Sequence, residues 1–334
     1  MMRNLLTDIA GVSVGHADDS GLGSGVTAIL FARPAVAAVA VLGGAPGGRD
    51  LGMLAPEATV GAIDAIVLSG GSAFGLDAAG GVQAFLRAQG RGLAIGGQHV
   101  PLVAQAILFD LANGGDKSWG DRPPYWDLGR RAAAAARGGA FALGSVGAGM
   151  GATTATLKGG LGSASAETST GHRVAALAAV NALGSATIGD GPHFWAAPFE
   201  VEGEFGARGW PPVIGTEALR PRLKGAAGTA TTIGVIATDA ALSKAEAHRL
   251  ALMAHDGLAR AILPAHAPLD GDTIFAAATG TRALGDPIAE LTELGFTATL
   301  TMARAIARGV FSATRLGISG ETPSWQERFG KIMR

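Results

Sequence analysis

Short apolar runs bounded by Gly or Pro recur along the chain and predict β-strands. A continuous apolar run of this length, with turn residues on both sides, is typical of a strand buried in a sheet. The predicted strands cover residues 26–31, 36–42, 65–68, 92–95, 232–237 and 274–279.

Apolar positions at helical spacing predict four helices between these strands. The clearest begins after Ser243, because Ser243 and Glu246 have the spacing of a capping box and Pro264 ends the segment. A second helix follows Ser72, as its N-cap, and ends near Gly90. The other two cover residues 130–136 and 300–308.

The composition of the chain indicates the fold class that these predicted strands and helices form. The chain has 334 residues, of which 48% are hydrophobic, 16% are charged and 53 are Gly, so it has ample material for a core and small residues that let layers approach closely. We therefore expect a layered α/β protein. Residues 111–128 and 189–230 look irregular, and the second stretch is long enough to suggest a functional segment.

Charge and cysteine usage exclude several classes of function. The net charge is −1, which gives no field to gather nucleic acid or an anionic membrane. The absence of Cys excludes disulfides, thiol nucleophiles and Cys-ligated metals, and the seven His residues show no metal-ligand spacing. The chain also lacks a signal-like start and a long apolar run. We expect a soluble, cytoplasmic protein.

Two further motifs do not fit the chemistry that they suggest. The Gly-rich segment 144–151 lacks the Lys of a phosphate loop, so a tight turn between layers explains it better. Ser72 lacks the second Gly of a nucleophile elbow, because position 74 is Phe.

The Thr-rich segment 228–239 is open to two interpretations. Thr231 and Thr232 are ordinary residues for the start of a strand. Alternatively, a Thr hydroxyl attacks its own preceding carbonyl, and cleavage leaves that Thr as a new N-terminus. Its α-amine, with a reference pKa of roughly 7.7–8.0, then serves as the base for the hydroxyl.

Four other polar residues stand in contexts that allow site chemistry. Lys158 lies among small apolar residues, where burial lowers a lysine pKa, although taken alone a surface lysine on a turn is the simpler explanation. Asn181 ends an apolar run and is either an oxyanion donor or a C-cap. Asp270 and Asp272 either share a proton or orient an amine and a hydroxyl, or else form a solvated turn.

Six motifs that follow one another along the chain together resemble the L-aminopeptidase/D-amidase-esterase peptidase family, which includes the β-aminopeptidases and the 6-aminohexanoate-oligomer (nylon) hydrolases. The resemblance runs from about residue 5 to residue 320, and the opening 6–16 also resembles the start of the family. The motifs are Gly43-Gly-Ala-Pro-Gly47, Leu68-Ser-Gly-Gly-Ser-Ala-Phe-Gly-Leu-Asp-Ala-Ala79, Gly144-Ser-Val-Gly-Ala-Gly149, Lys158-Gly-Gly-Leu-Gly162, Val180-Asn181 and Thr231-Thr-Ile-Gly-Val-Ile-Ala-Thr-Asp239.

This resemblance implies a four-layer αββα sandwich of the N-terminal-nucleophile type. It implies one domain, cut once between Ala230 and Thr231 into 1–230 and 231–334, with Thr231 as nucleophile and Thr232 as the fallback. It also implies a homo-oligomer, a tetramer of processed protomers.

The nylon-hydrolase branch is the closest in pattern, and it implies catalytic roles for a small set of residues. These are Lys158, Asn181, Thr231, Asp270 and Asp272. The chain departs from that branch at Ala230, where Asn is usual, and from the β-aminopeptidase branch at Thr231, where Ser is usual.

We therefore expect an amidohydrolase that acts on small amides, short peptides or ω-amino-acid oligomers through an acyl-enzyme, without a metal or an organic cofactor. Two alternatives remain open at this point. One is an acyltransferase of the ornithine-acetyltransferase type, which also self-cleaves before Thr. The other is an unprocessed small-molecule binding protein, which Ala230 allows.

Overall fold

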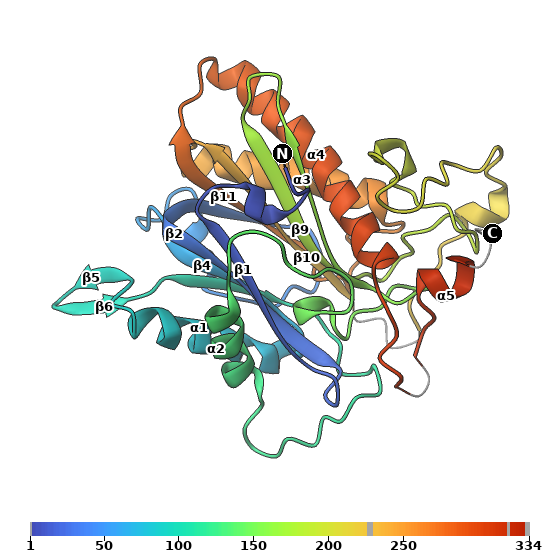
Figure 1. Cartoon of the computed structure of the whole chain (residues 1–334), viewed down its shortest axis with the longest axis horizontal. Helices are drawn as coiled ribbons and strands as arrows, with labels where there is room; N and C mark the ends of the chain where they lie inside the picture. Colours follow the sequence, from blue (N-terminus) through green and yellow to red (C-terminus); the bar gives the residue numbers. More distant parts are fainter. Residues whose placement is uncertain (1, 226–229, 319–320, 331–334) are drawn as a thin grey trace.

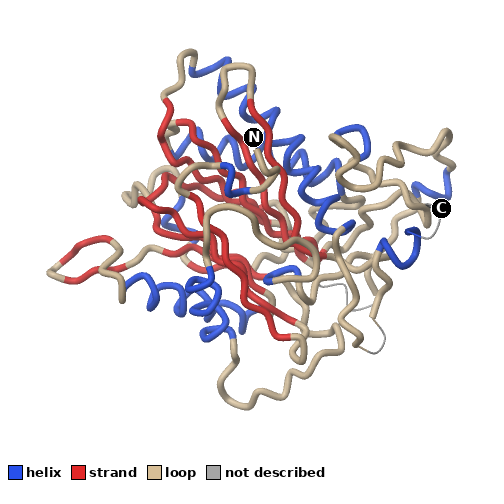
Figure 2. Tube along the Cα trace, in the orientation of Figure 1, coloured by secondary structure: helices blue, strands red, loops and turns tan. Residues whose placement is uncertain are grey.

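The computed structural model describes residues 2–225, 230–318 and 321–330. Residues 226–229 of the predicted irregular stretch lie outside this range, and they include the first two residues of the Thr-rich segment. Strands occupy the middle of the molecule and helices lie on both outer sides (Figure 2).

The long strand β2 (Ser24–Val41) belongs to both halves of the sheet structure. Its first half pairs with β1 (Val12–Asp19) and β4 (Ile63–Ser69), and its second half pairs with β11 (Thr273–Arg282). The register against β4 shifts between Leu30 and Ala35, where the exposed Pro34 interrupts the pairing. The runs 26–31 and 36–42, predicted as two strands, are therefore one strand.

The remaining strands extend from β2 in two directions. On one side, β4 is followed by β7 (Val103–Ile107) and the short β3 (Gly48–Arg49). On the other side, β11 is followed by β10 (Thr231–Ala240), β9 (Arg173–Asn181) and β8 (Gly160–Glu167). A separate hairpin, β5 (Leu93–Ile95) with β6 (Gln98–Val100), projects away from the body (Figure 1).

Helices cover the outer face of each sheet. The first sheet consists of β1, the first half of β2, β4, β7 and β3, and it carries α1 (Ala78–Arg87) and α2 (Tyr125–Ala135) (Figure 1). The second sheet consists of the second half of β2, β11, β10, β9 and β8, and it carries α3 (Lys244–Ala261) and α4 (Pro287–Phe311). The short α5 (Trp325–Phe329) follows α4. Short 3₁₀ segments occupy Leu6–Asp8, Leu51–Leu54, Ser72–Asp77, Gly147–Gly149, Ala197–Phe199 and Thr216–Leu219.

The buried apolar side chains of the described residues form three clusters, one at each interface between layers. The middle cluster lies between the sheets and contains Ile29, Leu68 and Val235, among others. The outer clusters join each sheet to its helices. Alternate residues of one strand fall in different clusters, because successive side chains point to opposite faces. The predicted αββα layering is confirmed.

The helix predictions differ from the structure mainly at helix starts. The Ser243 capping box is confirmed, and α3 ends at Ala261, before Pro264. However, α2 begins at Tyr125 rather than 130. Helix α4 begins at Pro287 rather than 300, and the Asp286 side chain caps its start. Ser72 caps no helix, since its φ of 52° places it in the left-handed region inside a 3₁₀ turn.

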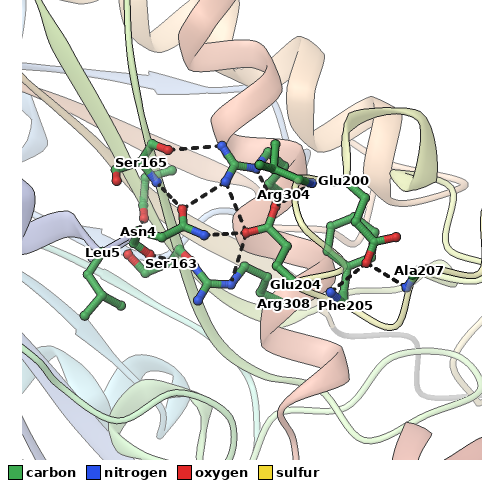
Figure 3. Close-up of polar contacts among 12 residues, drawn as sticks. Asn4, Leu5, Ser163, Ser165, Glu200, Glu204, Phe205, Ala207, Arg304 and Arg308 are labelled. Carbon is green, nitrogen blue, oxygen red and sulfur yellow. Dashed lines mark hydrogen bonds and ion pairs between the residues drawn. The ribbon is translucent and has the colours of Figure 1, made fainter. Parts of the chain in front are cut away.

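A buried ionic network joins the 200–207 loop to α4, β8 and the start of the chain (Figure 3). Arg304 Nε donates to Glu204 Oε1 over 2.5 Å, and Arg304 Nη2 donates to Asn4 Oδ1 over 2.9 Å. Arg308 donates to the carbonyl oxygens of Asn4 and Ser163. The network therefore fixes segments that are far apart in the sequence.

None of the helices in the described ranges is both long and apolar enough to cross a bilayer.

Glycines let α4 lie directly on β8. A Cβ added at Gly162 would stand 1.9 Å from the Ala305 carbonyl oxygen and 2.3 Å from the Gly309 nitrogen. The helix and the strand therefore touch through their backbones, and this close contact has no room for a methyl group.

We predict that Gly162→Ala lowers the free energy of unfolding by about 1–3 kcal/mol, because α4 must move away from β8. The matched control is Gly52→Ala, where an added Cβ meets nothing within 4 Å and the change should stay within about 1 kcal/mol. Chemical denaturation measures both, and equal stabilities of the two variants would contradict the close contact.

Candidate functional site

Thr231, the first residue of β10, points between the two sheets. Its neighbours on the same face of the strand, Ile233 and Val235, belong to the middle apolar cluster. Thr231 pairs with Asn181 of β9 in an antiparallel register, so the two side chains lie side by side on that face. Thr232 points the other way, toward the helix layer, as does its partner Val180.

The Thr231 hydroxyl lies against the carbonyl group of its own preceding residue. Thr231 Oγ1 donates to the Ala230 carbonyl oxygen over 2.5 Å, and the Gly271 N–H donates to the same oxygen over 3.0 Å. Thr231 is buried, with 4% of its surface exposed. The Thr231 hydroxyl and the Gly271 N–H therefore both contact the carbonyl group of the Ala230–Thr231 peptide bond.

Asp272 binds both strand β10 and the turn that precedes β11. Its Oδ1 accepts the Thr232 N–H over 2.8 Å. Its Oδ2 accepts the His266 N–H over 3.0 Å and lies 2.9 Å from His266 Nδ1. Asp272 is buried, so the interpretation as a solvated turn is wrong.

Asp270 holds the same turn from its other side. Its carboxylate accepts the N–H groups of Leu183 and Ala267 over 3.3 and 3.1 Å. Burial, and then the nearby Asp272 carboxylate, raise the pKa of Asp270 to about 6. Asp270 and Asp272 precede β11 instead of lying on it, and neither carboxylate has a hydrogen bond to Thr231 Oγ1 among the described residues.

Asn181 is fully buried, and its surroundings fix the orientation of its amide. Its Oδ1 accepts the Thr153 N–H over 3.0 Å and Lys224 Nζ over 2.6 Å, and its Nδ2 donates to the Phe109 carbonyl over 2.9 Å. Two donors on one side and a carbonyl on the other exclude the flipped amide. Asn181 ends a strand, so the interpretation as a helix C-cap is wrong.

Lys158 is 1% exposed, which overturns its interpretation as a surface lysine. Its Nζ donates to the carbonyl oxygens of Met150 and Ala152 over 2.8 and 2.7 Å, and to that of Gly159 over 3.3 Å. Burial lowers the pKa of Lys158 to about 8. Lys158 therefore fixes the Gly-rich segment that ends beside Asn181, and among the described residues it has no hydrogen bond to Thr231.

Lys224 belongs to the site although its sequence context gave no signal for it. It lies in the Pro-rich irregular stretch, where a lysine is usually solvated. Besides the contact with Asn181, its Nζ donates to the Thr153 carbonyl over 3.3 Å. Burial lowers the pKa of Lys224 to about 7, against the opposing effect of the Asp110 carboxylate.

Asp110 and His266 are two further polar residues that sequence reasoning missed. The buried Asp110 accepts Ser24 Oγ over 2.6 Å and the Gly71 N–H over 2.8 Å, and burial raises its pKa. The N–H of Gly71 belongs to the Ser-Gly-Gly-Ser motif, so that motif builds the support of Asp110. Only the fold shows that Asp110 is buried and that His266 contacts Asp272.

Within the described ranges, no group of three His, Asp or Glu side chains is placed to hold a metal ion. The chemistry available at this site is that of a hydroxyl, an amide, two carboxylates and two lysines with lowered pKa values.

Comparison with known proteins gives the family context. Residues 4–322 match the model of peptidase family S58. An uncharacterized aminopeptidase of Mycobacterium tuberculosis is 45% identical over 332 residues, covering 93% of this chain and 94% of the relative. A 6-aminohexanoate-oligomer endohydrolase of Kocuria sp. is 30% identical over 289 residues, covering 83% of this chain and 75% of the relative. The resemblance drawn from the motifs is confirmed.

Solved structures show the same fold. A β-aminopeptidase of Burkholderia sp. has a TM-score of 0.69 and 23% identity, covering 100% of this chain and 95% of that one. An L-aminopeptidase D-Ala-esterase/amidase of Ochrobactrum anthropi, described as a variant of the Ntn hydrolase fold, has a TM-score of 0.69 and 20% identity, covering 99% and 93%. The prediction of an N-terminal-nucleophile type of fold is confirmed.

The lowered pKa of Lys224 predicts a pH-dependent stability. An unfolded lysine titrates near 10.5, so between about pH 7 and 10.5 the unfolded chain binds more protons than the folded chain. The free energy of unfolding therefore gains a contribution that grows as the pH rises from 7, and Lys224→Met abolishes this contribution.

Chemical denaturation at pH 7 and pH 9.5 tests this expectation. Both proteins carry Thr231→Ala, which keeps the chain uncut if Thr231 is the nucleophile. The stability of the protein that keeps Lys224, relative to the Lys224→Met control, should increase at the higher pH. A difference that is the same at both pH values would contradict the burial of the charge.

Proposed function

The chain belongs to peptidase family S58 and is a hydrolase of amide bonds, and we propose that it acts after cutting itself between Ala230 and Thr231, with Thr231 as the nucleophile. The cut divides the chain into 1–230 and 231–334. Both pieces contribute strands to the same layered core, and we propose that they form one hydrolase domain.

One observation carries this proposal: the Thr231 hydroxyl lies 2.5 Å from the Ala230 carbonyl oxygen, at the start of a strand that is paired on both sides. Nucleophile and target group are thus held together before any reaction occurs. Thr232 is a poorer candidate, because its buried hydroxyl faces the helix layer and has no hydrogen-bond partner among the described residues.

Self-cleavage proceeds as an acyl shift followed by hydrolysis. Thr231 Oγ1 bonds to the Ala230 carbonyl carbon, the carbon–nitrogen bond breaks, and the hydroxyl proton passes to the departing nitrogen. Water then hydrolyses the ester, which leaves Ala230 as a carboxylate and Thr231 with a free α-amine. With a reference pKa of roughly 7.7–8.0, this amine can act as the base near neutral pH.

Substrate turnover repeats this chemistry on an external amide. Thr231 Oγ1 bonds to the substrate carbonyl carbon, the amide carbon–nitrogen bond breaks, and the amine leaves with the hydroxyl proton. Water then hydrolyses the ester of the acyl-enzyme, which releases the acid and restores the hydroxyl. Asn181 has one Nδ2 hydrogen beyond the one given to Phe109, and it lies beside Thr231, so it suits the substrate oxyanion. Asp270 and Asp272 hold the turn beside the new N-terminus, and Lys158 holds the segment beside Asn181.

The substrate class is extended from the relatives. The mycobacterial relative is named an aminopeptidase and the Kocuria relative a 6-aminohexanoate-oligomer endohydrolase. We propose that this chain acts on small amides, short peptides or ω-amino-acid oligomers.

Non-covalent contacts hold the two pieces together after the cut. Strand β9 belongs to the first piece and β10 to the second, and the two strands are paired from Thr231 with Asn181 to Thr238 with Val174. The ion pair between Glu204 and Arg304 also joins the two pieces (Figure 3). Processing therefore frees the Thr231 amine without separating the layers.

Mass spectrometry of the purified protein tests the cut directly. We predict two fragments that meet at 230/231, and one intact, inactive chain for Thr231→Ala. Thr232→Ala is the matched control and should cleave, because its hydroxyl lies on the opposite face of the strand. A wild-type chain that stays intact and still hydrolyses amides would refute the proposal.

Asn181→Ala tests the oxyanion role separately. We predict that kcat for a short amide falls about 10²–10³-fold, since one donor to the developing charge is lost. Fragment masses and thermal melting confirm that the variant is cut and folded. Turnover within a few-fold of the wild type would remove Asn181 from the mechanism.

A further inference from the structure

The Ala230 carbonyl oxygen has a second hydrogen-bond donor besides the Thr231 hydroxyl. The Gly271 N–H reaches it over 3.0 Å, within the range of donors that stabilise an oxyanion. We propose that the Gly271 N–H is the catalytic donor for self-cleavage: it takes up the negative charge that develops on the Ala230 oxygen. This inference rests on the proposed function, because it concerns the cut between Ala230 and Thr231.

Backbone pairing aligns Gly271 with the bond to be cut. Ala230 and Asp270 form an isolated parallel bridge, in which the Ala230 N–H donates to the Leu269 carbonyl over 3.4 Å and Gly271 donates back to Ala230. The Ala45 N–H also donates to the Asp270 carbonyl over 2.7 Å. The peptide unit that carries the Gly271 N–H is therefore held from two sides.

The two buried aspartates flank Gly271 and fix it further. Asp270 is tied to Leu183 and Ala267, and Asp272 is tied to Thr232 and His266. A donor whose position is set before the reaction needs no reorganisation when charge develops. In self-cleavage, the aspartates thus act as positioning residues for the Gly271 N–H.

The absence of a side chain at position 271 is required by the nucleophile. A Cβ there would stand 2.6 Å from Thr231 Oγ1 and 3.0 Å from the Ala45 carbonyl oxygen. Glycine lets the hydroxyl and the N–H approach the same carbonyl group from neighbouring positions.

Self-cleavage and turnover then use different donors. The Asn181 amide donates to the Phe109 carbonyl and, within the described part of the chain, has no hydrogen bond to the Ala230 oxygen. In the acyl shift, Thr231 Oγ1 bonds to the carbonyl carbon and the electron pair of the carbonyl moves onto the oxygen. The Gly271 N–H stabilises that oxygen until the carbon–nitrogen bond breaks and the nitrogen takes the hydroxyl proton.

Replacing Gly271 by glycolic acid tests the donor, because an ester oxygen then takes the place of the N–H and no side chain is added. The full chain is made by cell-free translation, and the cut at 230/231 is followed by mass spectrometry. We expect cleavage about 10²–10³-fold slower than in the wild type. The same replacement at Gly44 is the matched control, since its N–H donates over 3.3 Å to the Ala267 carbonyl and not to Ala230. That variant should cleave within a few-fold of the wild-type rate.

The outcomes separate this inference from the function on which it rests. A wild-type chain that never cuts refutes both. A wild-type chain that cuts, together with a Gly271 ester that cuts equally fast, overturns the donor role and leaves the nucleophile in place. If the Gly44 ester slows cleavage as much as the Gly271 ester does, the donor role is also overturned. The loss of any N–H in this region would then be enough to slow the reaction.

An intact-chain measurement decides the case in which the ester variant does not fold. In uncut Thr231→Ala protein labelled at Gly271 nitrogen and Ala230 carbonyl carbon, NMR should detect a scalar coupling across the hydrogen bond. Absence of the coupling, with the Gly271 amide exchanging freely with solvent, overturns the proposal.

Discussion

The Ala230 carbonyl group is the point on which the site depends. It lies just before β10, and the Thr231 hydroxyl and the Gly271 N–H both contact its oxygen. This convergence exists because β10 is paired on both sides, with Asn181 opposite Thr231 on β9 and with β11 starting just after Asp272. A change of register by one residue would turn Thr231 toward the helices and remove the hydroxyl from the site.

The surrounding polar groups are buried, and their partners are mostly backbone groups. Lys158 binds three carbonyl oxygens, while Asp270 and Asp272 bind N–H groups of neighbouring segments. Such contacts compensate the loss of water around each charge and also fix the loops that carry them. The same arrangement lowers the pKa of Lys158 and Lys224 and raises that of Asp270.

Sequence reasoning found a layered α/β protein, because the apolar runs and the Ser243 capping box are local signals, and the family resemblance supplied the αββα class. It missed β7, β8 and β9 as strands, since Ala- and Gly-rich strands buried on both faces show no alternation of polar and apolar residues. It also missed β1, where the polar residues Ser13 and His16 interrupt the apolar run. The start of α4 was missed as well, although Asp286 and Pro287 form a recognisable helix start.

The sequence by itself determined the family and the residue types of the site, since ordered motifs survive in the linear chain. Only the tertiary structure decided which way each residue faces. It made Lys158 and Asp270 buried instead of solvated, brought Lys224 to Asn181, and set Gly271 against Ala230. The physical reason is that burial and hydrogen bonding depend on the pairing of strands distant in sequence, which a local pattern does not encode.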